Sequence, residues 1–515
     1  MPSAQSRTYK SLRNSSVAMI FYLVALVLEF FSRKIFLDHL GEDVLGLNTT
    51  AQSLLQFLNI AEMGIGAAIA FALYRPLFAK DHQAISEIIS LMGHFYRRVA
   101  IFVIAGSAVL MCFFPQIFSK MTLPLWYAYV SYGALLTAAL ISYWFTYKQV
   151  ILAADQQNYK IQFAYRLPML IKVACQMAAV KWLDNGFVWW AALEAGFAGL
   201  SAITISLTVR RSYPYLRRVA ITRELRHRYR TVYTKIKQLL WGRVAGVILA
   251  QTSPLIIYAY IDLALVAIYG NYLIIVNGLC ALLRAVFNDM DGGVGNLVAS
   301  SGLKHILEVF REIFCVRFMI SAVLTFGAYM MTQPFIELWI GPQYLLGHTT
   351  LVLICMMLYV YLTRYIVESF IGAYGIYGDI FAPIVEAALN IGLSIWLGYY
   401  WGLNGILVGV VISLFLMVIC WKPYYLYLRG FRISIRHYIG IYARNLAVAV
   451  AAGAITLLIF GDSSSVSARH GLAALGYGAL ATIVFAVLLN VGLFLFHCGM
   501  ERFADRMYST IFRRR

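Results

Sequence analysis

Apolar residues fill long, nearly uninterrupted stretches of the chain, and short polar segments separate them. A helix needs about 20 mainly apolar residues to cross the hydrocarbon layer of a membrane. About fourteen stretches reach this length, at residues 15–36, 45–73, 97–118, 124–147, 160–182, 186–209, 239–260, 263–287, 313–338, 349–372, 380–401, 403–427, 438–460 and 472–496. The pattern therefore predicts an all-α polytopic membrane protein with about fourteen transmembrane helices.

The composition supports this interpretation. Hydrophobic residues make up 61% of the 515 residues and charged residues only 13%, whereas a soluble domain has about 25% charged residues. A soluble protein this apolar would have too few charges to cover its surface. The composition therefore excludes a secreted enzyme, a disordered regulator and a typical nucleic-acid-binding protein.

The net charge of +19 arises mainly from alternate loops between the predicted helices. In membrane proteins, Lys and Arg gather in the loops on the cytoplasmic side. If the N-terminus is cytoplasmic, the basic loops all fall on that side, and the chain is N-in and C-in. The longest basic run, residues 210–237, has ten basic residues and one acidic residue. We expect it to be a solvated cytoplasmic linker, with binding of anionic lipid headgroups as a further role.

This basic run separates six predicted helices from the eight that follow. At an offset of 219 residues, Arg98 aligns with Arg317 and Pro115 with Pro334. Transporters often contain internal repeats, so we expect two pseudo-symmetric six-helix lobes of the same orientation. The predicted parts are an N-lobe (1–209), the linker (210–238), a C-lobe (239–427) and two extra helices with a basic tail (428–515).

Polar residues within the predicted helices are candidates for function, because such groups are costly at membrane depth and usually face a protein interior or a wet cavity. In the first helix, Glu29 and Arg33 are four residues apart and can pair on one face. The second helix carries a polar stripe. Its members are Gln52, Gln56 and Asn59, with Glu62 next to them.

The second lobe has its own polar positions in helices seven and eight. Arg243 and Gln251 lie in the seventh helix, and Asn277 and Arg284 share a face of the eighth at a seven-residue step. The two arginines could line a cavity or extend to the membrane interface instead. The glycine-rich segment 291–295 is interpreted as the turn after this helix.

Other charged positions have structural explanations as well as functional ones. Arg364 and Glu368, four residues apart, are interpreted mainly as a structural ion pair. Lys172 and Arg166 are weaker candidates for a cavity, and Glu194 could equally be a partner for another helix or a proton site.

Several kinds of chemistry have no sequence signature. The seven cysteines are scattered, with no CxxC pair or Cys/His cluster, so neither a metal site nor a disulfide framework is indicated and no cofactor is expected. A GxxxxGK[ST] loop for ATP phosphates is also absent. The loops opposite the basic ones are short, which argues against an enzyme with an extracytoplasmic catalytic domain.

Residues 32–89 resemble the beginning of a polysaccharide flippase of the Wzx type. The resemblance rests on the Ser-Arg pair at 32–33, the L-G…L-G-L pattern at 40–47, the E-M-G-I-G-A-A-I segment at 62–69, and the region from Tyr74 to Asp81. It continues loosely through the rest of the chain. This superfamily also contains drug-exporting MATE antiporters and lipid II flippases.

The resemblance implies a MATE-like V shape and export of undecaprenyl-diphosphate-linked sugar repeat units across the bacterial inner membrane, for O-antigen or exopolysaccharide. It assigns Arg33, Arg243 and Arg284 to a cationic cavity. Glu29 or Glu62 would couple transport to an ion gradient. The implied partners are membrane lipids and the polymerase and glycosyltransferases of the same pathway, with no nucleic acid. A MATE-type cation antiporter and a membrane polymerase or ligase remain alternatives.

Overall fold

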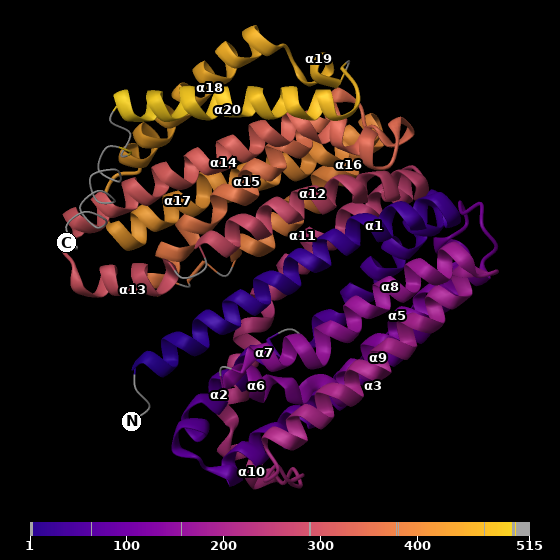
Figure 1. Ribbon diagram of the computed structural model, residues 1–515. Helices are drawn as coiled ribbons and strands as arrows, with labels where there is room; N and C mark the ends of the chain where they lie inside the picture. Colours follow the sequence, from indigo (N-terminus) through magenta and orange to yellow (C-terminus); the bar gives the residue numbers. More distant parts are fainter. Residues whose placement is uncertain are drawn as a thin grey trace. The chain divides into compact units, whose positions relative to one another are not determined.

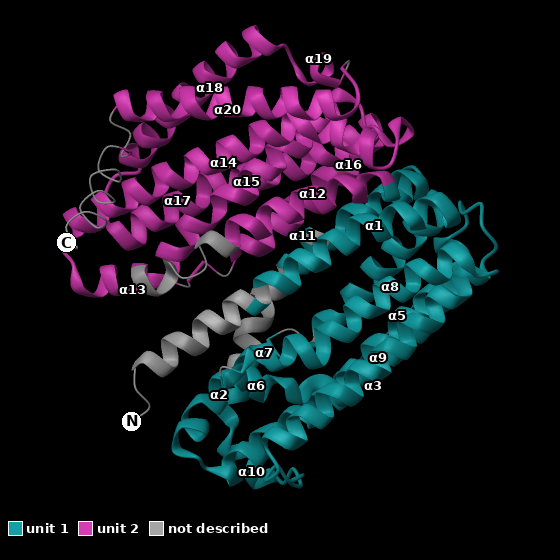
Figure 2. Cartoon of the chain, in the orientation of Figure 1, with its two compact units in different colours: residues 1–267 teal, residues 268–515 magenta. Residues whose placement is uncertain are grey.

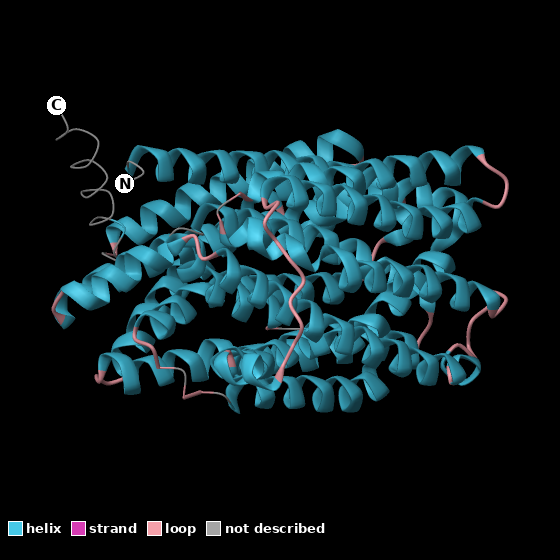
Figure 3. Cartoon of the chain, turned by 90° about the horizontal axis from the view of Figure 1, so that it is seen from below, coloured by secondary structure: helices cyan, strands magenta, loops and turns pink. Residues whose placement is uncertain are grey.

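The computed structural model describes residues 4–62, 64–155, 157–287, 290–376, 378–379, 381–467, 469–496 and 500. All regular secondary structure in these ranges is helical (Figure 3). The chain forms two compact units, Met1–Ala267 and Ile268–Arg515 (Figure 2). The division lies beyond the basic run at 210–238, because the helix that follows this run packs on the first two helices of the chain.

Unit 1 is a bundle of long helices joined by short ones (Figure 1). Helices α5, α8 and α9 lie side by side, and α3 packs on α5. The helices of this unit are α1 (Ala4–Asn59), α2 (Ile65–Ala79), α3 (His82–Cys112), α4 (Phe114–Ile117), α5 (Trp126–Phe145), α6 (Val150–Ala154), α7 (Asn158–Ile161), α8 (Leu167–Trp182), α9 (Gly186–Ser212), α10 (Arg223–Arg228) and α11 (Arg230–Tyr260).

Helix α1 consists of two helical segments that meet at Gly41. This residue has φ 83° and ψ 170°, a backbone conformation that is open to glycine and strained for other residues. The break separates the first predicted membrane helix (15–36) from the second (45–73). Gly46 then allows the second segment to approach the backbone of Leu263, whose carbonyl oxygen a Cβ atom at Gly46 would overlap.

Unit 2 begins within α12 and contains the remaining helices (Figure 1). These are α12 (Leu263–Phe287), α13 (Met290–Ser300), α14 (Leu303–Trp339), α15 (His348–Ala373), α16 (Phe381–Leu414), α17 (Lys422–Tyr425), α18 (Arg436–Phe460), α19 (Ser463–Ser467) and α20 (Gly471–Leu495). The glycine-rich segment 291–295 lies inside α13, so its interpretation as a turn is wrong. The packing of α13 on α15 outweighs the low helix propensity of glycine.

Helix α16 also contains a sharp turn, at Gly402 (φ 54°, ψ −134°). The chain reverses there, so that Gly405 and Gly409 lie against the backbone near Leu397 and Ser394, where a Cβ atom would clash. The turn falls between the predicted membrane helices 380–401 and 403–427. Two wide helical turns, Phe415–Trp421 and Leu426–Phe431, continue the second segment.

The core of unit 2 includes a cluster of aromatic rings. Phe310 of α14 is fully buried, and its ring centroid lies 5.1 Å from that of Phe370 and 5.3 Å from that of Phe431. Edge-to-face pairs at this spacing add to the stability that burial provides. On the other side of α14, Gly478 of α20 lies close to the backbone of Met330, a small-residue contact typical of membrane helices.

Ten helices in the described part of the chain are long and apolar enough to cross a membrane. They are His82–Cys112, Trp126–Ala154, Asn158–Trp182, Gly186–Ser212, Leu263–Arg284, Leu303–Trp339, His348–Ala373, Phe381–Phe431, Arg436–Ser467 and Gly471–Leu495. The chain is therefore an all-α, multi-pass membrane protein, as predicted. The number of fourteen crossings and the N-in/C-in orientation stay predictions.

Candidate functional site

A cavity of about 540 Å³ lies inside unit 1, where α2 and α3 meet the ends of α5 and α8. Its lining is mainly polar or small: Glu62, Gly64, Gly66, Ala67, Met92, Tyr96, Ser142, Thr146, Tyr147, Gln149, Val150, Ala153, Ile161, Tyr165 and Arg166. Ionisable side chains in membrane proteins usually face a protein interior or a wet cavity, and Glu62 and Arg166 lie on the wall of this one.

The entry to α2 shapes one wall of this cavity. Glu62 ends a 3₁₀ turn, Ile60–Glu62, that follows α1. Gly64 begins α2 with φ 90°, and no atom lies within 4 Å of the position that a Cβ of Gly66 would occupy. The small side chains leave the first turn of α2 open to the cavity, and the N-terminus of a helix carries a partial positive charge.

Glu62 is half-buried and lies among tyrosines. Tyr96, Tyr147 and Tyr165 line the same cavity as Glu62. Within the described residues, neither Glu62 nor Arg166 on the same cavity takes part in an ion pair. The cavity thus presents one carboxyl group and one guanidinium group to its interior. Glu62 was predicted from the sequence as a candidate for ion coupling.

Arg33 lies in the first segment of α1. Its Nη2 donates a hydrogen bond to the backbone oxygen of Ala267 at 2.8 Å, so it contacts the chain at the beginning of α12. The side chain of Arg33 is half-buried, while that of Glu29, one turn earlier, is exposed.

The residues of the polar stripe predicted in the second membrane helix lie in different environments. Asn59 is buried and accepts a hydrogen bond from the Tyr143 hydroxyl at 2.7 Å, so it joins α1 to α5. Gln56 is half-buried and Gln52 is exposed. The structure therefore gives Asn59 a role in holding two helices together.

The candidates from the predicted helices seven and eight are also spread out. Arg284 is exposed, and its Nε donates to the Cys280 carbonyl of its own helix at 3.3 Å. Asn277 is exposed and Gln251 is half-buried. The side chain of Arg243 lies outside the described residues. Arg33 and Arg243 belong to unit 1 and Arg284 to unit 2.

Two charged groups in unit 1 form a pair between helices. Lys172 Nζ of α8 lies 2.7 and 2.8 Å from the two carboxylate oxygens of Glu194 on α9. Gln176 also donates to Glu194, at 3.0 Å. Of the two possibilities for Glu194, the structure shows the interhelical partner.

A larger charge network lies in unit 2. Arg364 donates to Glu368 at 2.6 Å and to Glu386 at 3.1 Å, and Lys422 lies 3.4 Å from Glu368. The Glu386 side chain is completely buried. The expected Arg364–Glu368 pair is thus confirmed, and Glu386 and Lys422 extend it to two other helical segments.

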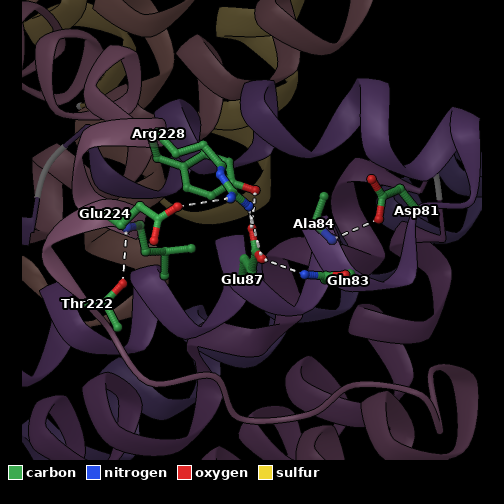
Figure 4. A network of polar contacts seen from close by, with 9 residues as sticks. Asp81, Gln83, Ala84, Glu87, Thr222, Glu224 and Arg228 are labelled. Atoms are coloured by element: carbon green, nitrogen blue, oxygen red, sulfur yellow. Dashed lines mark hydrogen bonds and ion pairs between the residues drawn. The ribbon is translucent and has the colours of Figure 1, made fainter.

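Part of the basic run at 210–237 is folded against α3. Thr222 caps α10 by accepting a hydrogen bond from the Leu225 amide at 3.2 Å. Glu87 of α3 accepts hydrogen bonds from Arg228 at 3.3 Å and from the Tyr229 hydroxyl at 2.9 Å. Figure 4 shows this network between α10 and the first turns of α3. The expectation of a solvated linker therefore holds for only part of the run.

Sequence reasoning missed Tyr96, Gln149 and Tyr165 on the cavity wall. These residues belong to separate helical segments. The sequence of one segment does not indicate which other segments meet it at the cavity. No group of three or more His, Cys, Asp or Glu side chains in the described ranges is arranged to hold a metal ion.

Comparison with known proteins identifies the fold. No family model matches the sequence, and no curated protein does. Among solved structures, the lipid II flippase MurJ in an inward closed conformation has a TM-score of 0.60 with 12% identity, covering 92% of this chain and 100% of that one. The fold is that of MATE-like transporters.

Two further structures support the same fold. An inward-facing multidrug resistance MATE family transporter of the MOP superfamily has a TM-score of 0.59 with 13% identity, covering 76% of this chain and 92% of that one. A MOP superfamily transporter from Pyrococcus furiosus, described as having a binding pocket of reverse polarity, has a TM-score of 0.54 with 12% identity. It covers 82% of this chain and 96% of that one. The MATE-like fold expected from residues 32–89 is confirmed.

Proposed function

We propose that this chain is a flippase that moves undecaprenyl-diphosphate-linked sugar repeat units across the bacterial inner membrane. The observation that carries the proposal is the likeness of fold to a lipid II flippase over 92% of the chain. The resemblance of residues 32–89 to polysaccharide flippases, described above, supports the same class of substrate. Membrane lipids and the polymerase and glycosyltransferases of the pathway would be the partners.

The physical task is to carry a diphosphate and several sugars through a layer that cannot hydrate them. Charged and hydroxyl groups lose a large amount of free energy when they leave water without new partners. Guanidinium groups such as those of Arg33, Arg243 and Arg284 can bind phosphate oxygens bidentately. Amides such as Gln52, Gln56, Gln251 and Asn277 can replace water around sugar hydroxyls, and alternating access would expose the bound substrate to each side in turn.

The cavity around Glu62 supports coupling to an ion gradient. A carboxyl group without an ion-pair partner on the wall of a polar cavity can take up a proton or a cation from one side and release it to the other. The half-buried position of Glu62 allows this exchange, whereas Glu194 and Glu386 are held by Lys172 and Arg364. Among the acidic candidates, Glu62 is therefore the one that we propose for coupling, ahead of Glu29.

A MATE-type antiporter of cationic compounds is the alternative. The MATE transporter matches with a TM-score of 0.59, nearly the same as the flippase, and the carboxyl group of Glu62 would also suit a cation. In this case Glu62 would be essential, and the three arginines would be dispensable.

The test uses purified protein in vesicles containing undecaprenyl-diphosphate-linked oligosaccharide of defined structure. We expect flipping by the native chain and a loss of at least tenfold in Arg33→Ala, Arg243→Ala and Arg284→Ala. Arg210→Ala, which removes an exposed charge at the end of α9, is the control and should flip normally. Glu62→Gln should flip at a rate that no longer responds to an imposed ion gradient.

The outcomes separate the two functions. Unchanged flipping in all three arginine variants would remove the cavity assignment. Absence of flipping, together with gradient-driven export of a cationic dye that Glu62→Gln abolishes, would replace the flippase with the antiporter.

A further inference from the structure

A second cavity, of about 410 Å³, lies in unit 1 where the basic run crosses α3. Among the residues that the structure describes, four basic side chains line it and no acidic side chain does. The lining consists of Ile89, Ser90, Gly93, Arg97, Tyr143, Trp144, Phe145, Tyr147, Lys148, Ser206, Leu216, Arg217, Arg218 and Val219.

The crossing segment is fixed to α3 by its backbone. The amide of Val219 donates to Ser90 Oγ at 2.9 Å, and the amide of Arg217 donates to Ser86 Oγ at 3.4 Å. The ring of Tyr215 stacks on His82 with centroids 3.7 Å apart. These contacts, together with the anchoring of α10 by Glu87, hold Arg217 and Arg218 at one wall of the cavity.

The helices under the crossing segment supply the other two cations. Arg97 lies on α3, where its Nε donates to the Gly93 carbonyl at 3.2 Å. Lys148 follows α5, with its Nζ 5.9 Å from the ring centroid of Tyr147. Arg97, Tyr147 and Arg218 all line this one cavity.

None of these four cations forms an ion pair within the described residues. Like charges gathered around one cavity repel each other unless an anion lies between them. The nearby carboxylate of Glu87 is already bound to Arg228 and Tyr229. The cavity therefore has the charge that a bound anion would neutralise.

The apolar part of the lining indicates which kind of anion. Trp144 and Phe145 are 45% and 53% exposed, at the end of α5 and within the longer apolar span Trp126–Ala154. Exposed aromatic rings are enriched where membrane helices meet the lipid headgroups, and basic pockets between membrane helices bind acidic headgroups. We infer that this cavity binds the phosphate of an anionic phospholipid.

The test measures lipid binding to the purified full chain by native mass spectrometry. The probes are dioctanoyl phosphatidylglycerol, dioctanoyl phosphatidylcholine and inorganic phosphate. Arg217→Gln/Arg218→Gln should weaken phosphatidylglycerol binding by about 25-fold, because each Lys or Arg near an anionic headgroup contributes a factor of about five. The control is Arg210→Gln/Arg223→Gln, which removes two exposed charges that do not line the cavity and should change binding less than twofold.

Lys148→Gln is a second variant that leaves the crossing segment intact. We expect it to weaken phosphatidylglycerol binding about fivefold, so a loss caused only by a loosened linker would be recognised. Equal losses in the cavity variant and its control would overturn the proposal, as would phosphatidylcholine binding as tightly as phosphatidylglycerol. Inorganic phosphate binding as tightly as the lipid would make the ligand a free anion and reject the phospholipid. The proposal does not depend on flippase activity.

Discussion

The charged cavity wall of unit 1 differs from the charge network of unit 2 in how its charged groups are paired. In unit 1, Glu62 and Arg166 lie on the wall of a cavity without ion-pair partners among the described residues. In unit 2, Arg364 is surrounded by Glu368 and Glu386, and the second of these is completely buried. A charged group on the wall of a water-filled cavity can gain or lose a proton or change its partner. Charged groups packed into a network of ion pairs do so less readily. The difference supports the proposal of ion exchange at the unit 1 cavity, whereas the unit 2 network joins three helical segments.

Arg98 and Arg317, which align at the offset of 219 residues, also differ between the two units in burial and contacts. Arg98 is exposed. Arg317 is only 2% exposed, donates to the Leu362 carbonyl at 2.9 Å and lies over the ring of Tyr365. If the two lobes arose by duplication, the order of their helices was kept while the environments of their charged residues diverged.

The unit 2 network gives the largest expected effect. Arg364→Met should lower the free energy of unfolding by about 3–5 kcal/mol, because it leaves the carboxylates of Glu368 and Glu386 without their main cation. The measurement is chemical unfolding of the purified protein in detergent. Arg284→Met, which removes an exposed arginine bound only to its own helix among the contacts seen, is the control and should change stability by less than about 0.5 kcal/mol.

A combined variant sharpens this prediction. Arg364→Met together with Glu368→Gln and Glu386→Gln removes the uncompensated charges as well as the cation, so it should recover most of the lost stability. A loss as large as that of Arg364→Met alone would mean that packing of the arginine stem, rather than its charge, holds these helices together.

The ion pair of unit 1 should have a smaller effect. Lys172→Met leaves Glu194 with Gln176 as a donor, and both charged side chains of the pair are 14% exposed. We expect a loss of about 2 kcal/mol. A double-mutant cycle with Glu194→Gln, measured by the same unfolding assay, should give a coupling energy of about 1–2 kcal/mol. Additive losses would show that the two side chains act independently.

Sequence patterns located the breaks at Gly41 and Gly402 but missed a third one. The predicted helix 45–73 is interrupted by the turn Ile60–Glu62 and by Gly64 at the start of α2. The boundary predicted between 401 and 403 coincides with the turn at Gly402. The boundary predicted between 36 and 45 contains the break at Gly41. The segment 291–295 was predicted as a turn because glycine has a low helix propensity. In the structure it is helical, since α13 packs on α15.

Side-chain partners were harder to predict, because they depend on contacts between helices. The Arg364–Glu368 pair was found since both residues lie four apart on one helix. Glu386, on another helix, was not connected to them. The folded basic run was missed for the same reason, because its anchor Glu87 lies on α3 and the composition of the run alone suggests solvation. The cavity around Glu62 likewise forms only where several helices meet.

The anchoring of the basic run can be tested through its local stability. Glu87→Gln weakens the hydrogen bonds from Arg228 and Tyr229 and should lower the stability of the docked segment by about 1–2 kcal/mol. Trypsin should then cleave at residues 217–230 about tenfold faster, since cleavage follows the population of the open form. Glu224→Gln is the control, because Glu224 is exposed and lies 3.9 Å from Arg228. It should leave the cleavage rate unchanged.

The smallest expected effect is at Glu42, in the turn after Gly41. Burial raises the pKa of this carboxyl, and the neighbouring carboxylates of Asp43 and Asp262 raise it further. The folded protein therefore holds this proton more tightly than the unfolded chain, so the stabilising contribution is present at acid pH and is lost as the pH rises. Glu42→Gln keeps a neutral side chain throughout and should be more stable at pH 7 by a few tenths of a kcal/mol, a small value because solvent screens the site.

Melting temperatures measured between about pH 4 and pH 7, a range that starts near the ordinary carboxyl pKa, check this sign. The advantage of Glu42→Gln should grow with pH and be absent near pH 4. Asp43→Asn removes one of the charges that raise the pKa of Glu42, so the advantage should shrink in that background. An advantage that is constant with pH would mean that the substitution acts through packing and that the carboxylates at this turn do not interact.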